Sequence, residues 1–419
     1  MFDDRPVRVH VDAVVRVNQE FVAPLDLEST DVSSLQERTD DLLGFGVLLI
    51  ASASNEGHFQ RQIVWATAAI VLALAVSAVD YRKLTDRAYE LWAISMLVLV
   101  GMLLFAPVTS GARSWLSIGG VGLQPSELAK VAVILALAHY FAEGDPLPFG
   151  ARGLFVPSVL VLVPFVLVAS QPDLGTASTF LPMLAGIAWV AGIRYATAAR
   201  LTAVAAGMAP LGYFLLKDYQ RARLLTFLNP EDDPLGSAYQ VVQSKIAVGS
   251  GGVLGTGLFA GSQSKGEFLP AQHTDLVFAV LGEELGFIGV TLVLALYLVL
   301  LLRVLQTARL ARDRAGTYLA TGVAALMLYH LLVNVGMVIG FAPITGIPLP
   351  LLSYGGSSAL TSGIAIGLVM SVRTRRFLNE PAYLNAPRRQ GAEKDVDTRR
   401  ASELGAEKLP AILQHPAVQ

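Results

Sequence analysis

The sequence predicts an all-α, polytopic integral membrane protein with ten transmembrane helices. Charged residues make up 15% and apolar residues 53% of the 419 positions, whereas soluble proteins carry about 25% charge. A surface this poor in charge cannot face water everywhere. The apolar residues come in long blocks rather than in alternation, as in helices that cross a bilayer. The length would also suit two or three soluble domains, but the composition favours one membrane bundle.

Ten apolar segments follow one another along the chain. Nine of them are convincing as spans. The first has about 13 residues and covers only about 20 Å of a hydrocarbon core about 30 Å thick. It would therefore be a short helix that thins the bilayer. The segments are residues 42–54, 63–79, 91–108, 128–141, 154–169, 177–193, 201–216, 276–302, 317–339 and 359–372.

The basic residues of the loops predict the orientation, because Lys and Arg gather on the cytoplasmic side. The short loops of one side carry only Arg61 and Arg113. Thirteen basic residues lie on the other connections and the C-terminal exit, so we expect the C-terminus inside. They are Arg82, Lys83, Arg87, Arg152, Arg194, Arg200, Arg303, Arg309, Arg312, Arg314, Arg373, Arg375 and Arg376.

The remaining parts of the chain flank or interrupt the predicted transmembrane domain, residues 42–376. Residues 217–275 form one long outer loop between helices 7 and 8, with a short amphipathic helix at 240–248. Residues 1–41 are polar and show no signal-peptide pattern. They are either cytoplasmic or the product of an abnormal start. Residues 377–419 are rich in Ala, Pro and charge, which predicts a disordered cytoplasmic tail.

Composition also excludes some kinds of function. The chain has no cysteine, which rules out disulfides, cysteine zinc sites and thiol nucleophiles. A formal net charge of −2 argues against a nucleic-acid partner. His273 has no second ligand at zinc spacing, so the sequence predicts no protein metal site.

Two motifs place charges close to the membrane, where each is costly. In "QPSELAK", Glu127 and Lys130 are three residues apart on one helix face and can pair. The pair is either a structural lock for a helix end or part of a site. In "HTDLVFAV", Thr274 or Asp275 could cap the eighth helix. Alternatively, Asp275 is a partly desolvated carboxylate with a raised pKa, suited to general-base catalysis.

Irregular backbone gathers on the predicted outer side. The segment 340–358 is rich in Pro and Gly, and "GSGGVLGTG" at 249–257 is rich in Gly. Inside a membrane such backbone must line a cavity or be buried in protein. "QPDLGT" at 171–176 reads as a tight turn, and "GARSW" at 111–115 offers a cation beside an aromatic. One side of the bundle therefore carries the candidate site.

Five motifs together resemble the SEDS family of bacterial proteins (shape, elongation, division and sporulation). They are "GARSWLSIGGVGLQPSELAK", "QPDLGTA", "YQVVQSKIAVGSGGVLGTG", "FLPAQHTDLVFAVLGEELG" and "GIPLPLLSYGGSS". Their order and spacing match from about residue 45 to 375, and "GSQSKGEFLP" and "NVGMVIGFAPITGIPLPL" are closer to the RodA-like branch than to FtsW. The resemblance implies a multi-pass bacterial inner-membrane glycosyltransferase that polymerises lipid II into peptidoglycan, active site facing outward. It also implies a rod-shape role and a class B penicillin-binding protein as partner.

The resemblance assigns Asp275 as the catalytic residue and makes Glu127 and Lys130 functionally important. We expect Asp275 to take the proton from the C4 hydroxyl of the acceptor N-acetylglucosamine, which attacks the lipid-linked donor with inversion. Undecaprenyl pyrophosphate leaves and must meet cations, and a divalent ion, Mg²⁺ or Mn²⁺, would help. Other residues expected to bind substrate or support the site are Arg113, Arg221, Arg223, Lys245, His273, Thr274, Ser353 and Ser357.

Two other classes of protein remain as alternatives. A lipid II flippase would also use broken helices and an intramembrane ion pair, but its polar residues would approach both membrane faces. The other is a scaffold that only recruits the transpeptidase, and supplying the purified protein with lipid II separates these classes.

Overall fold

A computed structural model describes residues 33–53, 56–107, 113–118, 121–144, 150–228, 237–265, 268–269 and 273–378. The chain divides into two units, Met1–Arg376 and Phe377–Gln419, and the following concerns the first. The predictions for residues 1–32 and for the tail beyond 378 lie outside the described residues.

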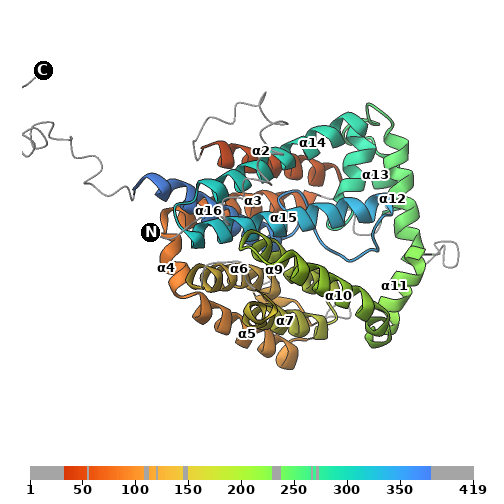
Figure 1. Ribbon diagram of the computed structural model, residues 1–419. Helices are drawn as coiled ribbons and strands as arrows, with labels where there is room; N and C mark the ends of the chain where they lie inside the picture. Colours follow the sequence, from red (N-terminus) through yellow and green to blue (C-terminus); the bar gives the residue numbers. More distant parts are fainter. Residues whose placement is uncertain are drawn as a thin grey trace, which may run out of the picture. The chain divides into compact units, whose positions relative to one another are not determined.

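The described part is almost entirely helical (Figure 1). The helices are α2 (Ser33–Ala53), α3 (Glu56–Ala78), α4 (Tyr81–Asp86), α5 (Ala88–Phe105), α6 (Pro125–Glu143), the 3-10 turn η1 (Ala151–Leu154), α7 (Phe155–Ser170), α8 (Leu174–Ser178), α9 (Phe180–Val190), α10 (Tyr195–Leu215), α11 (Asp218–Leu228), α12 (Ser237–Gly251), α13 (Ser262–Lys265), α14 (Val277–Leu310), α15 (Arg314–Ile339) and α16 (Gly356–Leu378). The strands are β1 (Leu116–Ile118) and β2 (Val121–Leu123), which pair antiparallel with Leu116 opposite Leu123.

Six described helical segments are long and apolar enough to cross a membrane. They are His58–Ala78, Ala88–Phe105, Pro125–Glu143, Ala151–Ser170, Val277–Leu310 and Arg314–Ile339. The helical membrane architecture is therefore confirmed, while the count of ten spans stays a prediction. The two-stranded hairpin was not predicted by the apolar pattern, because three-residue strands leave no periodic signal.

The first helix is longer than its apolar segment. The predicted span starts at residue 42, but α2 starts at Ser33. Leu35, Leu42 and Leu49 are fully buried at seven-residue spacing, and α2 packs against α3 and α14. The polar residues between them continue the helix on its other face, where Arg38 and Asp41 form an ion pair at 3.0 Å. One buried face is enough to hold the polar half helical.

Helix α14 is kinked at Gly286, where φ is 60° and the backbone is not helical. The carbonyls of Glu283 and Glu284 instead accept hydrogen bonds from Thr256 and Gly257, at 3.0 Å each. Only glycine adopts such a φ readily. The glycine-rich stretch after α12 is thus irregular backbone that bonds to the kink of α14. Most of residues 252–257 are exposed, so the expectation that this stretch is buried in protein is not met. Glu283 is fully buried, and its carboxylate accepts a hydrogen bond from the Gln263 backbone N–H at 2.7 Å.

The bundle has two ends with different contents. Helix α14 runs from Val277 to Leu310 and α15 returns, so their shared turn at Asp313 lies at the opposite end from Asp275. At the Asp313 end, which we call the ion-pair end, Arg82 contacts Asp313 at 2.8 Å and Arg375 contacts Asp80 at 3.7 Å. These basic residues belong to the predicted inner connections. The predicted outer segments meet at the other end, which we call the cavity end.

Candidate active site

The cavity end holds a cavity of about 820 Å³. Five separate stretches of the chain line it, so it forms only when the bundle is assembled. Its lining includes Ser114, Trp115, Gln124 and Glu127; Pro172, Asp173, Leu174, Gly175 and Thr176; Leu216, Gln220, Arg223 and Leu224; Thr274 and Asp275; and Pro343, Ile344, Thr345, Gly346, Pro348, Tyr354, Gly355, Ser357 and Ser358.

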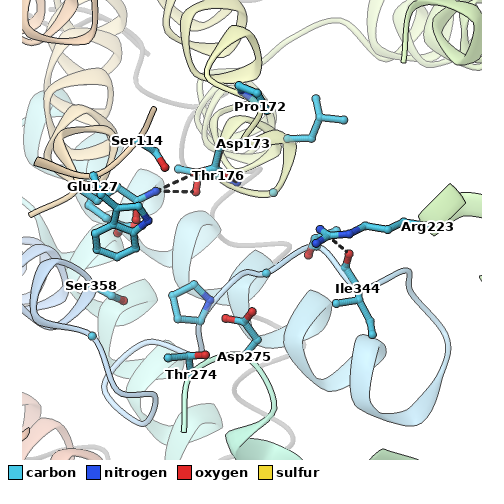
Figure 2. Close-up of a pocket in the computed structure, with 18 of the residues that line it drawn as sticks. Ser114, Glu127, Pro172, Asp173, Thr176, Arg223, Thr274, Asp275, Ile344 and Ser358 are labelled. Carbon is cyan, nitrogen blue, oxygen red and sulfur yellow. Dashed lines mark hydrogen bonds between the residues drawn. The ribbon is translucent and has the colours of Figure 1, made fainter. Parts of the chain in front are cut away.

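Asp275 lies in the turn that leads into α14, and its carboxylate points into the open centre of the cavity (Figure 2). The pKa of Asp275 is raised to about 6: burial is the largest cause and the charge of Asp173 adds a smaller increase, whereas Arg223 and a hydrogen bond from Thr274 lower the pKa. Desolvation outweighs the single nearby cation. Asp275 is therefore a base that is ionised near neutral pH and binds a proton only slightly below it.

The capping alternative is wrong for Asp275. The N-cap position of α14 is Leu276, and no side chain there bonds to the first turn. What holds the Asp275 turn is its own backbone carbonyl, which accepts a hydrogen bond from Asn334 of α15 at 2.9 Å. The carboxylate is thus left for other work.

The predicted Glu127–Lys130 pair is present at the start of α6. Lys130 Nζ lies 2.7 Å from Glu127 Oε1, and both side chains are buried. Pro125 stands at the first position of the helix, where its missing N–H costs nothing. Glu127 lines the cavity, whereas Lys130 points to His330 of α15 at 3.3 Å. Glu127 is thus part of the cavity wall, and Lys130 links it to α15.

Three other predicted residues also line the cavity. Arg223 of α11 reaches in from one side (Figure 2), and its guanidinium donates a hydrogen bond to the Ile344 carbonyl at 3.2 Å. Thr274 precedes Asp275. Ser357, in the first turn of α16, accepts a hydrogen bond from the Gln124 backbone N–H at 2.8 Å. Together with Asp275 and Glu127, these residues are brought to one place by four different elements.

The remaining predicted residues lie outside the lining. Arg113 donates a hydrogen bond to the Leu103 carbonyl at 2.9 Å. Arg221 donates to the carbonyls of Tyr213 and Phe214 at 3.2 and 2.6 Å, at the end of α10. In both cases the guanidinium is engaged by backbone at a helix end.

Lys245, His273 and Ser353 also lie outside the lining of the cavity. The Lys245 side chain of α12 lies directly over Gly340 at the end of α15. The His273 ring packs on His58 with centroids 4.8 Å apart, and burial together with His58 lowers the pKa of His273. Ser353 Oγ accepts a hydrogen bond from the Leu349 N–H at 2.8 Å and so fixes the irregular segment before α16.

Sequence reasoning missed the polar group at the wall opposite Asp275. Asp173 accepts a hydrogen bond from the Gln124 amide at 2.8 Å and caps α8 through the Thr176 N–H at 3.0 Å. A Cβ at Gly175 would stand 2.2 Å from the Thr345 carbonyl, so only glycine allows this turn to meet the segment before α16. The signal was the "QPDLGT" motif, which predicts a turn but not what the turn faces.

The charges of the cavity are unbalanced. Among the described lining residues, Asp173, Glu127 and Asp275 are acidic and Arg223 is basic. Lys130 compensates Glu127 from behind the wall. The described residues bring together no group of three His, Asp or Glu side chains that could hold a metal ion. An anionic substrate would therefore meet Arg223 together with whatever cations it brings.

Comparisons with known proteins agree on one family. The family model described as cell cycle protein, of the FtsW, RodA and SpoVE type, matches residues 39–377. A curated relative, peptidoglycan glycosyltransferase MrdB of Escherichia coli strain K12, is 40% identical over 344 residues, which cover 80% of this chain and 91% of MrdB.

Two solved structures are similar in fold and sequence. A chain from a study of polymerization and crosslinking by a peptidoglycan synthase complex superposes with a TM-score of 0.71 at 34% identity, over 82% of this chain and 97% of that one. The rod shape determining protein RodA of Thermus thermophilus superposes with a TM-score of 0.62 at 28% identity, over 82% and 96% of the two chains.

Proposed function

This chain belongs to the FtsW, RodA and SpoVE family of cell cycle proteins, and from that premise we propose that its cavity is the active site of a peptidoglycan glycosyltransferase. The resemblance read from the five sequence motifs is thereby confirmed, and with it a multi-pass membrane protein. The similarity to RodA and MrdB fits a role in rod shape and elongation.

The observation that carries the proposal is the state of Asp275. The carboxylate faces a cavity, its pKa is raised to about 6, and it caps no helix. A carboxylate that serves only stability is normally paired or capping, with a pKa that is lowered rather than raised. A general base works best with a pKa close to the working pH, and Asp275 meets that condition.

In the proposed reaction the two substrates are carried by lipids. Asp275 takes the proton from the C4 hydroxyl of an N-acetylglucosamine, and that oxygen forms a bond to the anomeric carbon of the lipid-linked donor. The bond from that carbon to the pyrophosphate oxygen breaks, with inversion, and undecaprenyl pyrophosphate leaves with the electron pair. The proton on Asp275 is then lost to water.

The leaving pyrophosphate needs positive charge near it. Arg223 is the cation that lines the cavity among the described residues, and it is anchored at the Ile344 carbonyl. We propose that a divalent cation supplies the rest. Mg²⁺ commonly binds through one or two carboxylates plus phosphate oxygens, which suits a cavity with acidic residues and an ion that arrives with the substrate.

We also propose an orientation and a partner. The cavity end faces the periplasm and the ion-pair end the cytoplasm, as the thirteen basic residues indicate. The partner is a class B penicillin-binding protein, which would cross-link the strands; a peptidoglycan synthase complex among the similar structures supports this. Since the chain lacks cysteine, single cysteines at exposed Lys217 and Arg312 can test the orientation. A membrane-impermeant maleimide should label the first in intact cells and the second only after permeabilisation.

The test of the function is polymerisation by the purified full-length protein. Supplied with lipid II and Mg²⁺ or Mn²⁺ in detergent, the wild-type chain should yield long glycan strands, and Asp275→Ala should yield at most a trace. Movement of labelled lipid II across proteoliposomes without polymer would support the flippase instead. If the wild-type chain forms no polymer either alone or with its penicillin-binding partner, the scaffold function is the one that remains.

A further inference from the structure

We infer that His330 and Asn334, one turn apart on α15, are positioning residues that fasten the catalytic turn and the cavity wall to the buried Glu127–Lys130 pair. The inference rests on the proposed function only for its consequence in catalysis, because the contacts themselves are structural. Neither residue lines the cavity, so both would act through groups that do.

Asn334 joins two segments that are far apart in sequence. Its side-chain nitrogen donates hydrogen bonds to the Asp275 carbonyl and to the Ile347 carbonyl, at 2.9 Å each. The amide NH₂ has two hydrogens, and both are used. Because both neighbours are carbonyl oxygens, only the NH₂ group can face them, which fixes the orientation of the amide. Asn334 is completely buried, so these bonds do not compete with bulk water.

His330, one turn before Asn334 on α15, contacts the Glu127–Lys130 ion pair through Lys130. Its Nδ1 lies 2.9 Å from the Pro348 carbonyl, and its Nε2 lies 3.3 Å from Lys130 Nζ. A carbonyl only accepts, so Nδ1 carries the proton. The ammonium only donates, so Nε2 is the bare acceptor. The ring is therefore neutral. It completes a continuous chain of contacts that runs from Glu127 through Lys130 and His330 to the Pro348 carbonyl.

These contacts meet in one short stretch of the cavity wall. Ile347 and Pro348 follow Gly346, and a Cβ at Gly346 would lie 3.5 Å from Asp275 Oδ2. The stretch 344–348 and the Asp275 turn contain no helix or strand, so they lack the regular backbone bonds that fix other parts of the chain. Side chains supply bonds instead. Asn334 and His330 hold the Asp275, Ile347 and Pro348 carbonyls, while earlier in the stretch Arg223 holds the Ile344 carbonyl and the Met337 sulfur accepts a hydrogen bond from the Thr345 N–H at 3.0 Å. A base displaced by about 1 Å can lose about a hundredfold in rate, which gives such anchoring a catalytic consequence.

The test compares Asn334→Ala with a matched control on the same helix, Thr321→Val. Thr321 is buried like Asn334, but its hydroxyl bonds only to the Thr317 carbonyl of its own helix, at 2.8 Å. In hydrogen–deuterium exchange of the full-length protein, Asn334→Ala should raise exchange at least tenfold in peptides covering 273–277 and 344–349. Thr321→Val should leave both peptides unchanged. Equal exchange in the two variants, or a rise spread over the whole chain, would overturn the inference without any assay of activity.

Kinetics with lipid II test the consequence for catalysis. Asn334→Ala should lower kcat about tenfold or more with KM for lipid II changed less than threefold. The variant removes a bond to Asp275 itself, whereas the binding cation Arg223 is carried by α11 and loses no bond of its own. A rise in KM with kcat unchanged would contradict a positioning role. If wild-type polymerisation itself is absent, the proposed function fails, while the exchange experiment still decides the inference.

Variants of His330 separate its two contacts. His330→Asn keeps a donor near the Nδ1 position and loses the contact with Lys130, whereas His330→Leu loses both contacts. We expect His330→Asn to retain the wild-type exchange of 344–349 and His330→Leu to raise it severalfold. The same exchange in both variants would show that the bond to Pro348 holds nothing in place.

Discussion

Asp275 and Asp313 each stand just before a long helix, at opposite ends of the bundle, and the protein uses them differently. Asp313 is the N-cap of α15, bonded to the Gly316 N–H at 2.8 Å, to the Tyr81 hydroxyl at 2.9 Å and to Arg82 at 2.8 Å. Every oxygen of its carboxylate is occupied. Asp275 has a hydrogen bond from Thr274 and a cation at a distance, and it faces a cavity.

The two ends of the bundle differ in the same way. At the ion-pair end, basic side chains bind acids and helix carbonyls; Arg375, for example, donates to the carbonyls of Ser77 and Ala78 at the end of α3. Burial and the Asp313 charge raise the pKa of Tyr81, so its hydroxyl stays protonated and keeps donating. At the cavity end an acid is desolvated without full compensation. One end is built to be stable and the other to react.

The largest expected effect is that of removing Asp275, which should affect activity but not stability. Asp275→Ala should lower polymerisation about 10²–10⁴-fold, the usual contribution of a general base. The raised pKa means that the folded chain resists ionising Asp275, so its charge destabilises the fold above pH 6. Removal should therefore leave the melting midpoint at pH 7.5 unchanged or higher, as thermal unfolding of the purified protein can show.

The matched substitution Asp313→Ala should do the reverse. The lost cap costs about 1 kcal/mol, and the Tyr81 hydroxyl left without an acceptor costs about 1–3 kcal/mol. The melting midpoint should fall clearly, while polymerisation per folded molecule stays within about threefold. A large loss of rate in Asp313→Ala, or a large loss of stability in Asp275→Ala, would abolish the distinction between the ends.

A second prediction follows from the pKa of Asp275, which is raised to about 6. The base must be ionised to accept a proton, so the rate should fall as the pH drops through 6 and reach about a tenth of its plateau near pH 5. Polymerisation rates at saturating lipid II between pH 4.5 and 8 measure this. A rate that stays level down to pH 5 would mean that another group, or a carboxylate with an ordinary pKa, does the work.

Most of the long helices could be predicted from the sequence, because long apolar blocks directly indicate helices that cross a bilayer. The N-terminal half of α2 could not. Its polar residues form a helix because Leu35 and Leu42 pack inside the bundle, and that packing depends on a partner far along the chain. The cavity was accessible only in part for the same reason. Its walls meet through contacts such as Gly175 against the Thr345 carbonyl, and Asn334 against the Asp275 carbonyl.

Residue type alone also could not separate binding cations from structural ones. Arg223 and Arg221 are two residues apart in the same helix, and the sequence treats them alike. In the structure Arg223 turns to the cavity and Arg221 to the end of α10. For Asp275, both a cap and a base were open from sequence, because either role needs an acid at the start of a helix.

Arg223→Ala should have a smaller effect than loss of the base. Removing one donor to a developing charge costs about 10²–10³-fold in a closed site, and Arg223 is exposed, so we expect about tenfold in kcat/KM. Its charge also lowers the pKa of Asp275, so the acid limb of the pH profile should move to higher pH. If the rate falls but the acid limb of the pH profile does not move, Arg223 contributes to binding but does not lower the pKa of Asp275.

The smallest expected effect comes from Arg221→Ala. This variant tests whether structural and substrate-binding cations can be told apart within the cavity end. The Arg221 guanidinium is held by the carbonyls of Tyr213 and Phe214 and lies 5.7 Å from the Tyr213 ring centroid. Such contacts close a helix end and contribute about 0.5–1 kcal/mol through the ring at an exposed site. We expect a slightly lower melting midpoint, a rate within about threefold of wild type and an unshifted pH profile. Arg221→Ala could instead lose as much rate as Arg223→Ala. Catalysis would then depend on the summed positive charge near the cavity, and not on which arginine lines it.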